Sequence, residues 1–479
     1  MDGLECSEVT YIYVREVCDV MRLDSMFYSK QFLECERLIQ SKTIFPLKNI
    51  CTSVRSFGAY SLNNYVEYQN SGIPFIRGVN MKNGIIDFEN MLYISEGVNK
   101  ILYKSEVFPN TVLLSMSGTI GDVGLALPEW KYPINSNQDI AKIRVNPEAI
   151  SAYYLYAFLR SRFGQEYLIR EARGSVQQHV FLSQIENFKI PVISRALSSE
   201  IENIVKDGFL HYEKSKLSYS LAQQFLLTTL HFKAETLYTE NTAVKSFSES
   251  FMTAGRLDAE FYQPKYDQLF AVLTAFTTSP LGGPYGIADF RKSIEPGSES
   301  YGEEGIPFVR VSDITKFGVS APEIKLPVDI VEHPEALFPQ KDSILFSKDG
   351  SVGIAYKLEE DAQFITSSAL LQLTIRDTEK VLPDYLTLVL NSPVVQLQAE
   401  RAASGAIIQH WKPSEIQQVI IPVLDMAEQK KLSQMVQESF SLRRRSEQLL
   451  DYAKRAVELA IEQGEDFAMS WLKEKGGTG

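Results

Sequence analysis

The sequence contains two Gln-His pairs at equivalent positions, and their residue types suit the binding of a polar ligand. Gln178-His179 and Gln409-His410 each follow a glycine-containing segment and precede a strand-like one. Amide and imidazole side chains can donate and accept hydrogen bonds at phosphates or base edges. The alternative is a buried, hydrogen-bonded pair that fixes its loop. We favour this alternative, because both places keep the same two residues.

Two further loops carry polar and basic residues. Gly118-Thr119 follows Met116-Ser117, whereas Gly350-Ser351 follows Lys348-Asp349. The glycines stay while their neighbours change, as expected of a variable loop on a fixed scaffold. A merely solvated loop is the alternative. Besides the two Gln-His pairs, the candidate binding residues are Arg77, Asn80, Lys82, Ser117, Thr119, Arg310, Ser312, Lys316, Lys348 and Ser351.

Few residues are arranged for catalysis. Glu428 and Lys430 have the spacing of a nuclease metal site, with Asp384 upstream as a further carboxylate. Glu428 would also open a long helix, where the helix dipole favours an acid. The sequence has no GxxxxGK[ST] phosphate loop, and His333-Pro334-Glu335 lacks the PCxxC partner of a deaminase. We therefore expect no catalytic centre, with a self-sufficient nuclease using Asp384 and Glu428 as an alternative.

The composition bounds the class of protein. The 479 residues are 44% hydrophobic and 23% charged, with a formal net charge of −12. Such an acidic chain would bind DNA through local basic patches or beside partners that contact the phosphates, so an interaction scaffold without a nucleic-acid role stays open. No apolar run is long enough to span a membrane. Cys6, Cys18, Cys35 and Cys51 lack zinc-site spacing, which predicts reduced thiols in a cytoplasmic protein without a bound metal.

A long internal repeat organises the chain. Arg22-Leu23-Asp24 with Phe27-Tyr28 returns 234 residues later as Arg256-Leu257-Asp258 with Phe261-Tyr262. The segment GIPFIR at 72–77 returns 233 residues later as GIPFVR, and Gly118-Thr119-Ile120-Gly121 returns 232 later as Gly350-Ser351-Val352-Gly353. Gly174 with its Gln-His pair and Ile190-Pro191 both return 231 later. Five blocks in one order indicate one ancestral unit used twice.

Each unit combines short strands with helices. We expect strands at Thr111–Ser115 and Ser343–Ser347, and apolar helices at Ala152–Arg162 and Asp384–Leu390. Long proline-free helical patterns then run over roughly Ser198–Phe232 and Met426–Leu472, with apolar residues at coiled-coil-like intervals. Because these two helices resemble each other, we expect them to pair. The alternative is that each packs only on its own domain.

The expected fold class is therefore α+β: two pseudo-repeated mixed α/β domains separated by two long antiparallel coiled-coil-like helices. The first domain is expected at 1–195, a central spacer helix and linker at 196–245, the second domain at 246–425, and a C-terminal spacer helix at 426–479. A helix of about 35 residues is roughly 50 Å long. That length is enough for two domains to read half-sites one DNA turn, about 34–36 Å, apart.

Taken together, these motifs resemble the specificity (S) subunits of type I restriction-modification enzymes. The resemblance rests on the RLDxxFY openings, GIPF[IV]R, the glycine turns at Gly118 and Gly350, and Ala403-Ser404-Gly405 with Gln409. It also rests on Ile421-Pro422 followed by the segment EQKKL at 428–432. The first unit departs from this pattern, because Ile190-Pro191 has no acidic-Gln-Lys segment after it.

The resemblance implies a function without catalysis by this chain. Each domain would be a target recognition domain that reads half of a bipartite double-stranded DNA sequence. The helices would dock two DNA adenine methyltransferase (M) subunits, and motor-nuclease (R) subunits would join for cleavage. S-adenosylmethionine, ATP and Mg would be bound by those partners rather than by this chain. A related methylation-based phage-defence system could use the same architecture.

Overall fold

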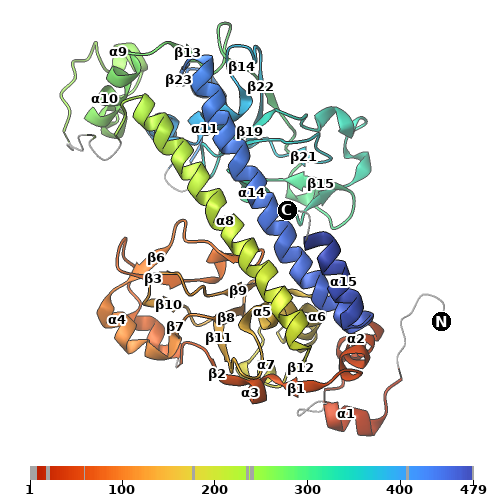
Figure 1. The fold of residues 1–479 in the computed structure, drawn as a ribbon. Coiled ribbons are helices and arrows are strands. Elements are labelled where there is room, and N and C mark those ends of the chain that lie inside the picture. Colours follow the sequence, from red (N-terminus) through yellow and green to blue (C-terminus); the bar gives the residue numbers. More distant parts are fainter. Residues whose placement is uncertain are drawn as a thin grey trace. The chain divides into compact units, whose positions relative to one another are not determined.

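The computed structural model describes residues 8–17, 22–58, 60–174, 178–233, 237, 242–405 and 409–476. The chain divides into two compact units. The first unit comprises residues 1–211 and 444–479, and the second comprises residues 212–443. Each unit contains one mixed domain of helices and strands together with part of each of two long helices (Figure 1).

The first domain is built on two four-stranded sheets. One is antiparallel, in the order β2 (Cys51–Arg55), β11 (Ile140–Val145), β8 (Thr111–Ser115), β9 (Val123–Leu125). The other is mixed, in the order β6 (Leu92–Ile94), β3 (Ile73–Ile76), β10 (Ile134–Ser136), β7 (Glu106–Val107), with β3 parallel to β10. A third pair joins β1 (Ile44–Pro46) to β12 (Lys189–Pro191). The helices are α1 (Tyr11–Val17), α2 (Lys30–Gln40), α3 (Leu47–Ile50), α4 (Glu96–Ile101), α5 (Ala152–Arg160), α6 (Arg162–Glu171) and α7 (Leu182–Ile185).

The second domain repeats this topology, except that its mixed sheet has three strands rather than four. Its antiparallel sheet has the order β14 (Ala288–Lys292), β22 (Leu370–Ile375), β19 (Ile344–Ser347), β20 (Ala355–Lys357). Its mixed sheet has β18 (Lys325–Leu326), β15 (Ile306–Val309) and β21 (Ile365–Thr366), with β15 parallel to β21, and β13 (Thr278–Pro280) pairs with β23 (Ile420–Pro422). The helices are α9 (Phe251–Ala254), α10 (Pro264–Leu273), α11 (Pro383–Leu390), α12 (Pro393–Ala402) and α13 (Pro413–Ile416). The strands and apolar helices expected around residues 111–115, 343–347, 152–162 and 384–390 are confirmed.

The repeated RLDxxFY motif ties the start of each domain to the end of a helix. Arg22 holds Asp24 through two hydrogen bonds of 2.7 and 3.0 Å, and its Nη1 donates to the carbonyl of Arg170, in the last turn of α6. Arg256 holds Asp258 in the same way, and its Nη1 donates to the carbonyl of Ala402 at the end of α12. An arginine there satisfies a carbonyl that the helix leaves unpaired. The motif is therefore structural in both domains.

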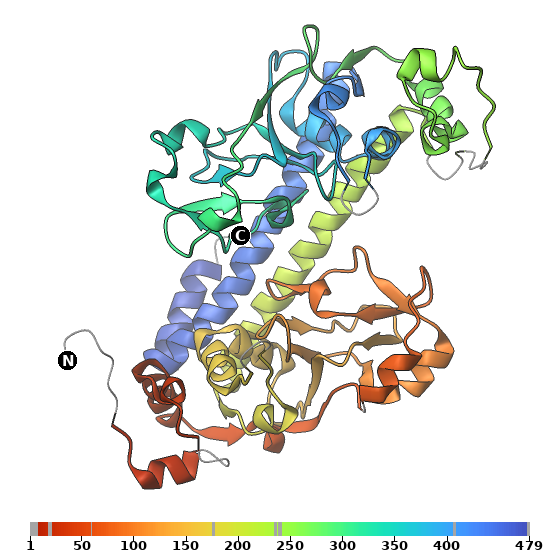
Figure 2. The same cartoon turned by 180° about the vertical axis from the view of Figure 1, so that it is seen from behind.

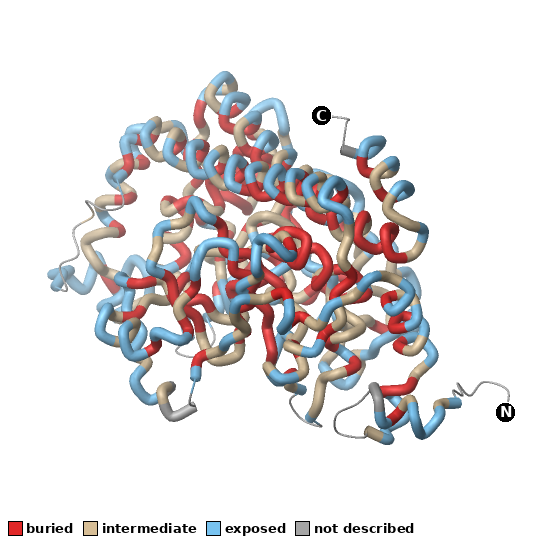
Figure 3. The backbone as a smooth tube through the Cα atoms, turned by 60° about the horizontal axis from the view of Figure 1, so that its bottom comes forward, coloured by how far each residue is buried: buried red, intermediate tan, exposed pale blue. Residues whose placement is uncertain are grey.

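The long helices pair within each unit. In the second unit, Ser439 Oγ on α14 (Met426–Glu462) donates to the carbonyl of Ser215 on α8 (Arg195–Thr229), at 2.8 Å. Ser218 Oγ donates to the carbonyl of Met435 at 3.0 Å, so the two helices run antiparallel. In the first unit, Gly208 lies against Leu450, and apolar residues of both helices share one buried cluster. Figure 3 shows the buried and exposed faces that result. The expected fold class and helix pairing are confirmed, and the alternative that each helix packs only on its own domain is wrong.

The C-terminal helical segment is shorter than expected. It ends at Glu462, Gly464 has a φ of +100°, and a separate helix, α15 (Glu465–Gly476), turns back beside α14 (Figure 2). Trp471 on α15 contacts Tyr452 on α14, with ring centroids 5.6 Å apart. The Glu465 carboxylate accepts a hydrogen bond from the backbone of Ser194, just before α8. The expectation of one helix from Met426 to Leu472 is therefore wrong, because a left-handed glycine breaks it.

Two of the four cysteines lie within the described part of the chain. Cys35 and Cys51 are free thiols, and burial raises the pKa of both, that of Cys51 to about 12. Cys6 and Cys18 lie outside the described residues. Across the described ranges, no helix combines the length and apolar character needed to cross a membrane.

Candidate nucleic-acid interface

Three segments of the first domain meet at one edge. We call residues 117–119, after β8, the first glycine loop. Thr119 Oγ1 lies beside Gly78, 3.4 Å from where a Cβ would stand. His179 forms isolated β-bridges with Ser117 and Arg173, and its backbone exchanges hydrogen bonds of 2.7 and 2.9 Å with Arg173. The structure thus brings together four of the predicted site residues, namely Arg77, Ser117, Thr119 and His179, with exposed Gln178 next to them.

Backbone hydrogen bonds hold the first glycine loop from both sides. The Met116 N–H donates to the carbonyl of Asp139, and its carbonyl accepts from Val180, at 2.7 and 2.9 Å. Gly118 at the tip has a φ of +75° and open space where a Cβ would stand. Only glycine adopts this conformation without strain, and the open space leaves the backbone accessible to a ligand.

A glutamine from α6 closes the base of this loop. Gln165 Nε2 donates to the carbonyls of Gly121 and Leu159, at 2.9 and 2.7 Å. Gly121 has a φ of +96°, and a Cβ there would collide with the Gln165 amide. The second glycine of the GxxG turn is therefore required by this contact as well as by its backbone conformation.

The second glycine loop, residues 349–351 after β19, has the same supports. The Lys348 N–H donates to the carbonyl of Ala369, and its carbonyl accepts from Trp411, at 2.9 and 2.8 Å. Gln396 on α12 donates to the carbonyls of Gly353 and Leu390, at 2.7 and 3.1 Å. Gly350 has a φ of +71° with open space beside it. The exposed Ser351 lies next to this glycine.

The two loops differ in the side chains at their tips. The first presents the hydroxyls of Ser117 and Thr119. In the second, Asp349 contacts Lys348 Nζ through one carboxylate oxygen, and His410 Nδ1 lies 2.8 Å from the other. The side chain of His410 is 60% exposed, whereas that of Lys348 is only 13% exposed. The same scaffold therefore carries a neutral tip in one domain and a charged tip in the other.

The turns after β3 and β15 are also matched. The side chain of Asn80 accepts from the backbone of Arg77 at 3.0 Å, and Asp313 accepts from the backbone of Arg310 at 2.8 Å. Asn80 is buried, so its amide serves the turn. Arg77 and Arg310 are half-buried at the ends of their strands, and Ser312 is exposed. A ligand could thus reach Arg77, Arg310 and Ser312, but not Asn80.

Each of these turns is followed by a hairpin that contains a predicted lysine. Lys82 lies in the hairpin of β4 (Met81–Lys82) and β5 (Ile85–Ile86), and Lys316 lies between β16 (Ile314–Thr315) and β17 (Gly318–Val319). The surroundings of the two lysines differ. Lys82 is exposed near Asp122, where burial raises the carboxyl pKa although a hydrogen bond from Thr119 and the charge of Lys82 lower it. Lys316 Nζ instead lies 5.3 Å from the ring centroid of Tyr219 on α8 and 5.1 Å from that of Phe317. Lys82 therefore belongs to the loop region, whereas Lys316 faces the long helix.

The sequence led us to favour buried Gln-His pairs, and this expectation is wrong. Gln178, Gln409 and His410 are exposed, and His179 is half-buried. In the second domain the pair does help to fix its loop, through the Gly350 N–H to the Gln409 carbonyl at 2.9 Å and through His410 Nδ1, 2.8 Å from the Asp349 carboxylate. Burial raises the pKa of Asp139, which the charge of His179 opposes. The side chains of both pairs are thus available beside the glycine loops.

Of the two carboxylates considered for a nuclease, that of Asp384 is engaged elsewhere. Asp384 is buried, with one oxygen 2.8 Å from Lys357 Nζ and the other accepting from Gln437 at 2.7 Å. The Glu428 N–H donates to Asp425 in the first turn of α14. No group of three or more His, Cys, Asp or Glu residues suited to a metal ion exists within the described ranges. The geometry therefore gives no support to the nuclease alternative.

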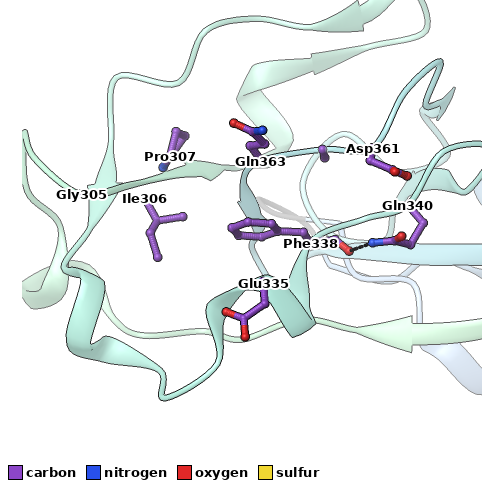
Figure 4. A pocket seen from close by; sticks show the side chains of 9 residues that line it. Gly305, Ile306, Pro307, Glu335, Phe338, Gln340, Asp361 and Gln363 are labelled. Atoms are coloured by element: carbon purple, nitrogen blue, oxygen red, sulfur yellow. Dashed lines mark hydrogen bonds between the residues drawn. The ribbon is translucent and has the colours of Figure 1, made fainter.

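One hollow of about 530 Å³ lies in the second domain (Figure 4). Gly305, Ile306 and Pro307 line it at the start of β15, away from Arg310 at the other end of that strand. The exposed Glu335 and Asp361 bring two carboxylates to its rim. Because phosphates would be repelled there, we do not count the hollow as part of the interface.

Comparison with known proteins gives a family for the first domain. Residues 41–194 match the family model of the type I restriction modification DNA specificity domain. The specificity subunit of the Escherichia coli type I restriction enzyme EcoBI is 26% identical over 142 residues, 29% of this chain. That match spans only 29% of the length of the relative. The resemblance inferred from the sequence motifs is thereby confirmed.

Solved structures of specificity subunits are also similar. The S subunit of a type I restriction-modification system from M. genitalium is 15% identical, with a TM-score of 0.36. The match covers 89% of this chain and 94% of the M. genitalium chain. The HsdS subunit from Thermoanaerobacter tengcongensis is 15% identical, covers 88% and 97%, and has a TM-score of 0.29.

Proposed function

We propose that this chain, whose residues 41–194 are a type I restriction modification DNA specificity domain, is a non-catalytic subunit that recognises a DNA sequence. Each domain reads one half of a bipartite duplex target. The observation that carries the proposal is the glycine loop, built twice on the same hydrogen bonds with different tip side chains. A fixed scaffold with a variable tip is what reading two different half-sites requires.

The chemistry belongs to partner subunits in this proposal. Two DNA adenine methyltransferase subunits dock on the chain and bind S-adenosylmethionine, and motor-nuclease subunits bind ATP and Mg. The net charge of −12 supports such an assembly, because partners would supply many of the phosphate contacts that an acidic chain lacks. The candidate contacts in this chain are the exposed residues around the two glycine loops.

Methylome sequencing tests the proposal directly. Cells that carry this chain with its neighbouring methyltransferase gene are compared with cells that lack only this chain. We expect a bipartite methylated motif that disappears without the chain. Exchange of residues 20–195 for the matching unit of a relative should then change one half-site only. A motif that persists without the chain, or methyl transfer by the purified chain alone, would contradict the proposal.

The role of the long helices as a spacer is a separate part of the proposal. Both α8 and α14 continue from one unit into the other, so their length would set the spacing of the half-sites. Removal of one matched turn from each helix shortens them by about 5.4 Å. We expect a shorter spacer with unchanged half-site sequences. A constant spacer length in such variants would contradict this role.

A further inference from the structure

Both carboxylate oxygens of Asp349, at the tip of the second glycine loop, are held by neighbouring side chains. Lys348 Nζ contacts Oδ2, and His410 Nδ1 lies 2.8 Å from Oδ1. The exposed fraction of the side chain is 13% for Lys348, 24% for Asp349 and 60% for His410. Lys348 is thus a support behind the carboxylate, whereas Asp349 and His410 reach the surface.

The hydrogen bond between these two residues determines which atoms remain available. An ionised carboxylate only accepts hydrogen bonds, so the proton between Asp349 and His410 must be on Nδ1. The Asp349 carboxylate therefore presents only acceptors at the tip of the second glycine loop, beside the hydroxyl of the exposed Ser351.

We propose that Asp349, positioned by Lys348 and His410, determines specificity by accepting a hydrogen bond from an exocyclic amino group in the second half-site. This inference rests on the proposed function and adds the class of base that is read. In the major groove, cytosine presents its N4 amino group and adenine its N6 amino group. Guanine O6 and thymine O4 are acceptors, and a carboxylate facing them would have no proton to share. At one position, the strand that faces Asp349 therefore carries cytosine or adenine.

The first domain provides the internal contrast. Ser117 lies 232 residues before Asp349, at the same place relative to its glycine. A hydroxyl both donates and accepts, so Ser117 can satisfy an amino or a keto group. Met116, at the place of Lys348, is buried and brings no charge to the loop. Selection by a carboxylate, which only accepts, is accordingly a property of the second half-site.

The test measures Asp349→Asn in the complex of the chain with its methyltransferase subunits. Dissociation constants are measured for the wild-type duplex and for duplexes in which each base pair of the motif is inverted in turn. The carboxamide adds a donor, which allows it to bind a keto group. At one position of the second half-site we expect the preference over the inverted pair to fall by about tenfold or more. Preferences in the first half-site should not change.

Two further variants serve as controls. Ser117→Asn makes the equivalent change in the first domain, and should affect the first half-site alone. Lys348→Met copies the first domain, and should weaken discrimination at the same position as Asp349→Asn but less. Amide hydrogen exchange on each complex verifies that the loop scaffold is intact.

The outcomes separate this inference from the proposed function. Unchanged preferences at every position in Asp349→Asn would overturn the inference, and so would an equal loss across both half-sites. Asp349 would also be excluded if its effect mapped to the first half-site. If the wild-type complex recognised no bipartite motif at all, the proposed function itself would fail.

Discussion

The two domains share a scaffold but bury different charges. In the first, Glu36 on α2 is 4% exposed and accepts from Arg170 at 2.8 Å and from Lys189 at 2.9 Å. The same places in the second domain, by the repeat spacing, are Phe270, Arg401 and Ile420. There the Arg401 guanidinium lies 5.1 Å from the ring centroid of Phe270 and 4.0 Å from that of Phe261. The contact with the motif phenylalanine is shared, because the Arg170 guanidinium also lies 4.1 Å from the ring centroid of Phe27. Only the ion pair with Glu36 is replaced, by the aromatic contact with Phe270.

The second domain has its own buried ion pair elsewhere. Lys357 on β20 and Asp384 on α11 are each 10% exposed and lie 2.8 Å apart. The matching residues of the first domain are Leu125 and Tyr153. Buried charges in these domains therefore follow no shared plan, and each is balanced locally by its own partners.

The two domains share a set of side-chain hydrogen bonds to backbone carbonyls. The Tyr154 and Tyr385 hydroxyls donate to the carbonyls of Pro191 and Pro422, at 2.6 and 2.7 Å. The glutamines beside the GxxG turns and the arginines of the RLDxxFY motifs also donate to carbonyls. Such bonds fix the chain path whichever side chains surround them. Both copies of the repeat have therefore kept the contacts that fix the chain path around a variable loop tip.

Removal of the Glu36 carboxylate should produce the largest effect. Burial raises its pKa, but hydrogen bonds from Tyr13, Arg170 and Lys189 outweigh this and lower the pKa to about 2. Because the folded value is below the unfolded one, its stabilising contribution is present above pH 4.5 and is lost as pH falls toward 2. Glu36→Ala should cost about 3–5 kcal/mol near neutral pH, since it leaves Arg170 buried without a counter-charge. Hydrogen exchange of first-domain amides measures this loss.

A double variant that copies the second domain serves as the control. Glu36→Phe with Lys189→Ile reproduces Phe270 and Ile420 around Arg170. If aromatic contacts and an ion pair are interchangeable here, this double variant should be clearly more stable than Glu36→Ala. Equal destabilisation of both variants would show that the domains are not equivalent at this place.

The second-largest effect is expected at Lys142, whose substitution should change how the stability of the protein depends on pH. It is 3% exposed, with Nζ 3.0 Å from the hydroxyls of Ser105 and Ser136, and burial lowers its pKa to about 7. The unfolded value is higher, so stability should rise as pH rises above 7. In the second domain Gln372 is at this place and donates to Thr366. In Lys142→Gln the gain between pH 7 and 9 should shrink by about 2 kcal/mol in urea denaturation. Parallel curves would show that Lys142 keeps an ordinary pKa.

The glutamines of the GxxG turns test the shared part of the scaffold. Gln165→Ala and Gln396→Ala each remove two hydrogen bonds to carbonyls. Each should cost about 1–2 kcal/mol. On the proposed function, each should also weaken discrimination at its own half-site alone, measured by binding to duplexes altered in one half. An effect on both half-sites from either variant would mean that the loops are not independent.

Much of the architecture was predictable because its signals are periodic. The recurring motifs predicted two equivalent domains, and the proline-free apolar stripes predicted the paired helices. The GxxG turns were visible because glycines at matched places report a backbone requirement. The break at Gly464 was missed because the helical periodicity resumes after it, although a glycine between polar residues was a signal that could have located it.

The contacts that build the candidate interface were harder to predict from the sequence. Gln165 is 44 residues from Gly121, and nothing in a helical sequence separates a glutamine that closes a distant turn from one in solvent. Asp349 was noted beside Lys348, but only Lys348 was among the candidate binding residues. Its contact with His410 spans 61 residues, and this pairing exists only once the fold brings the strands together.

The two hairpin lysines give the smallest and most selective test. Lys316 lies over Tyr219 and Phe317, and Phe317 in turn lies 4.1 Å from the guanidinium of Arg443 on α14. Lys316→Ala should therefore cost about 0.5–1 kcal/mol of stability through lost cation–π contacts. Its effect on the salt dependence of DNA binding should be small, because the ammonium group faces α8. Lys82→Ala, at the exposed place in the first domain, should leave stability unchanged and reduce the salt slope if Lys82 contacts a phosphate. Reversed results, with Lys316 controlling the salt slope, would show that this hairpin faces DNA rather than the helix.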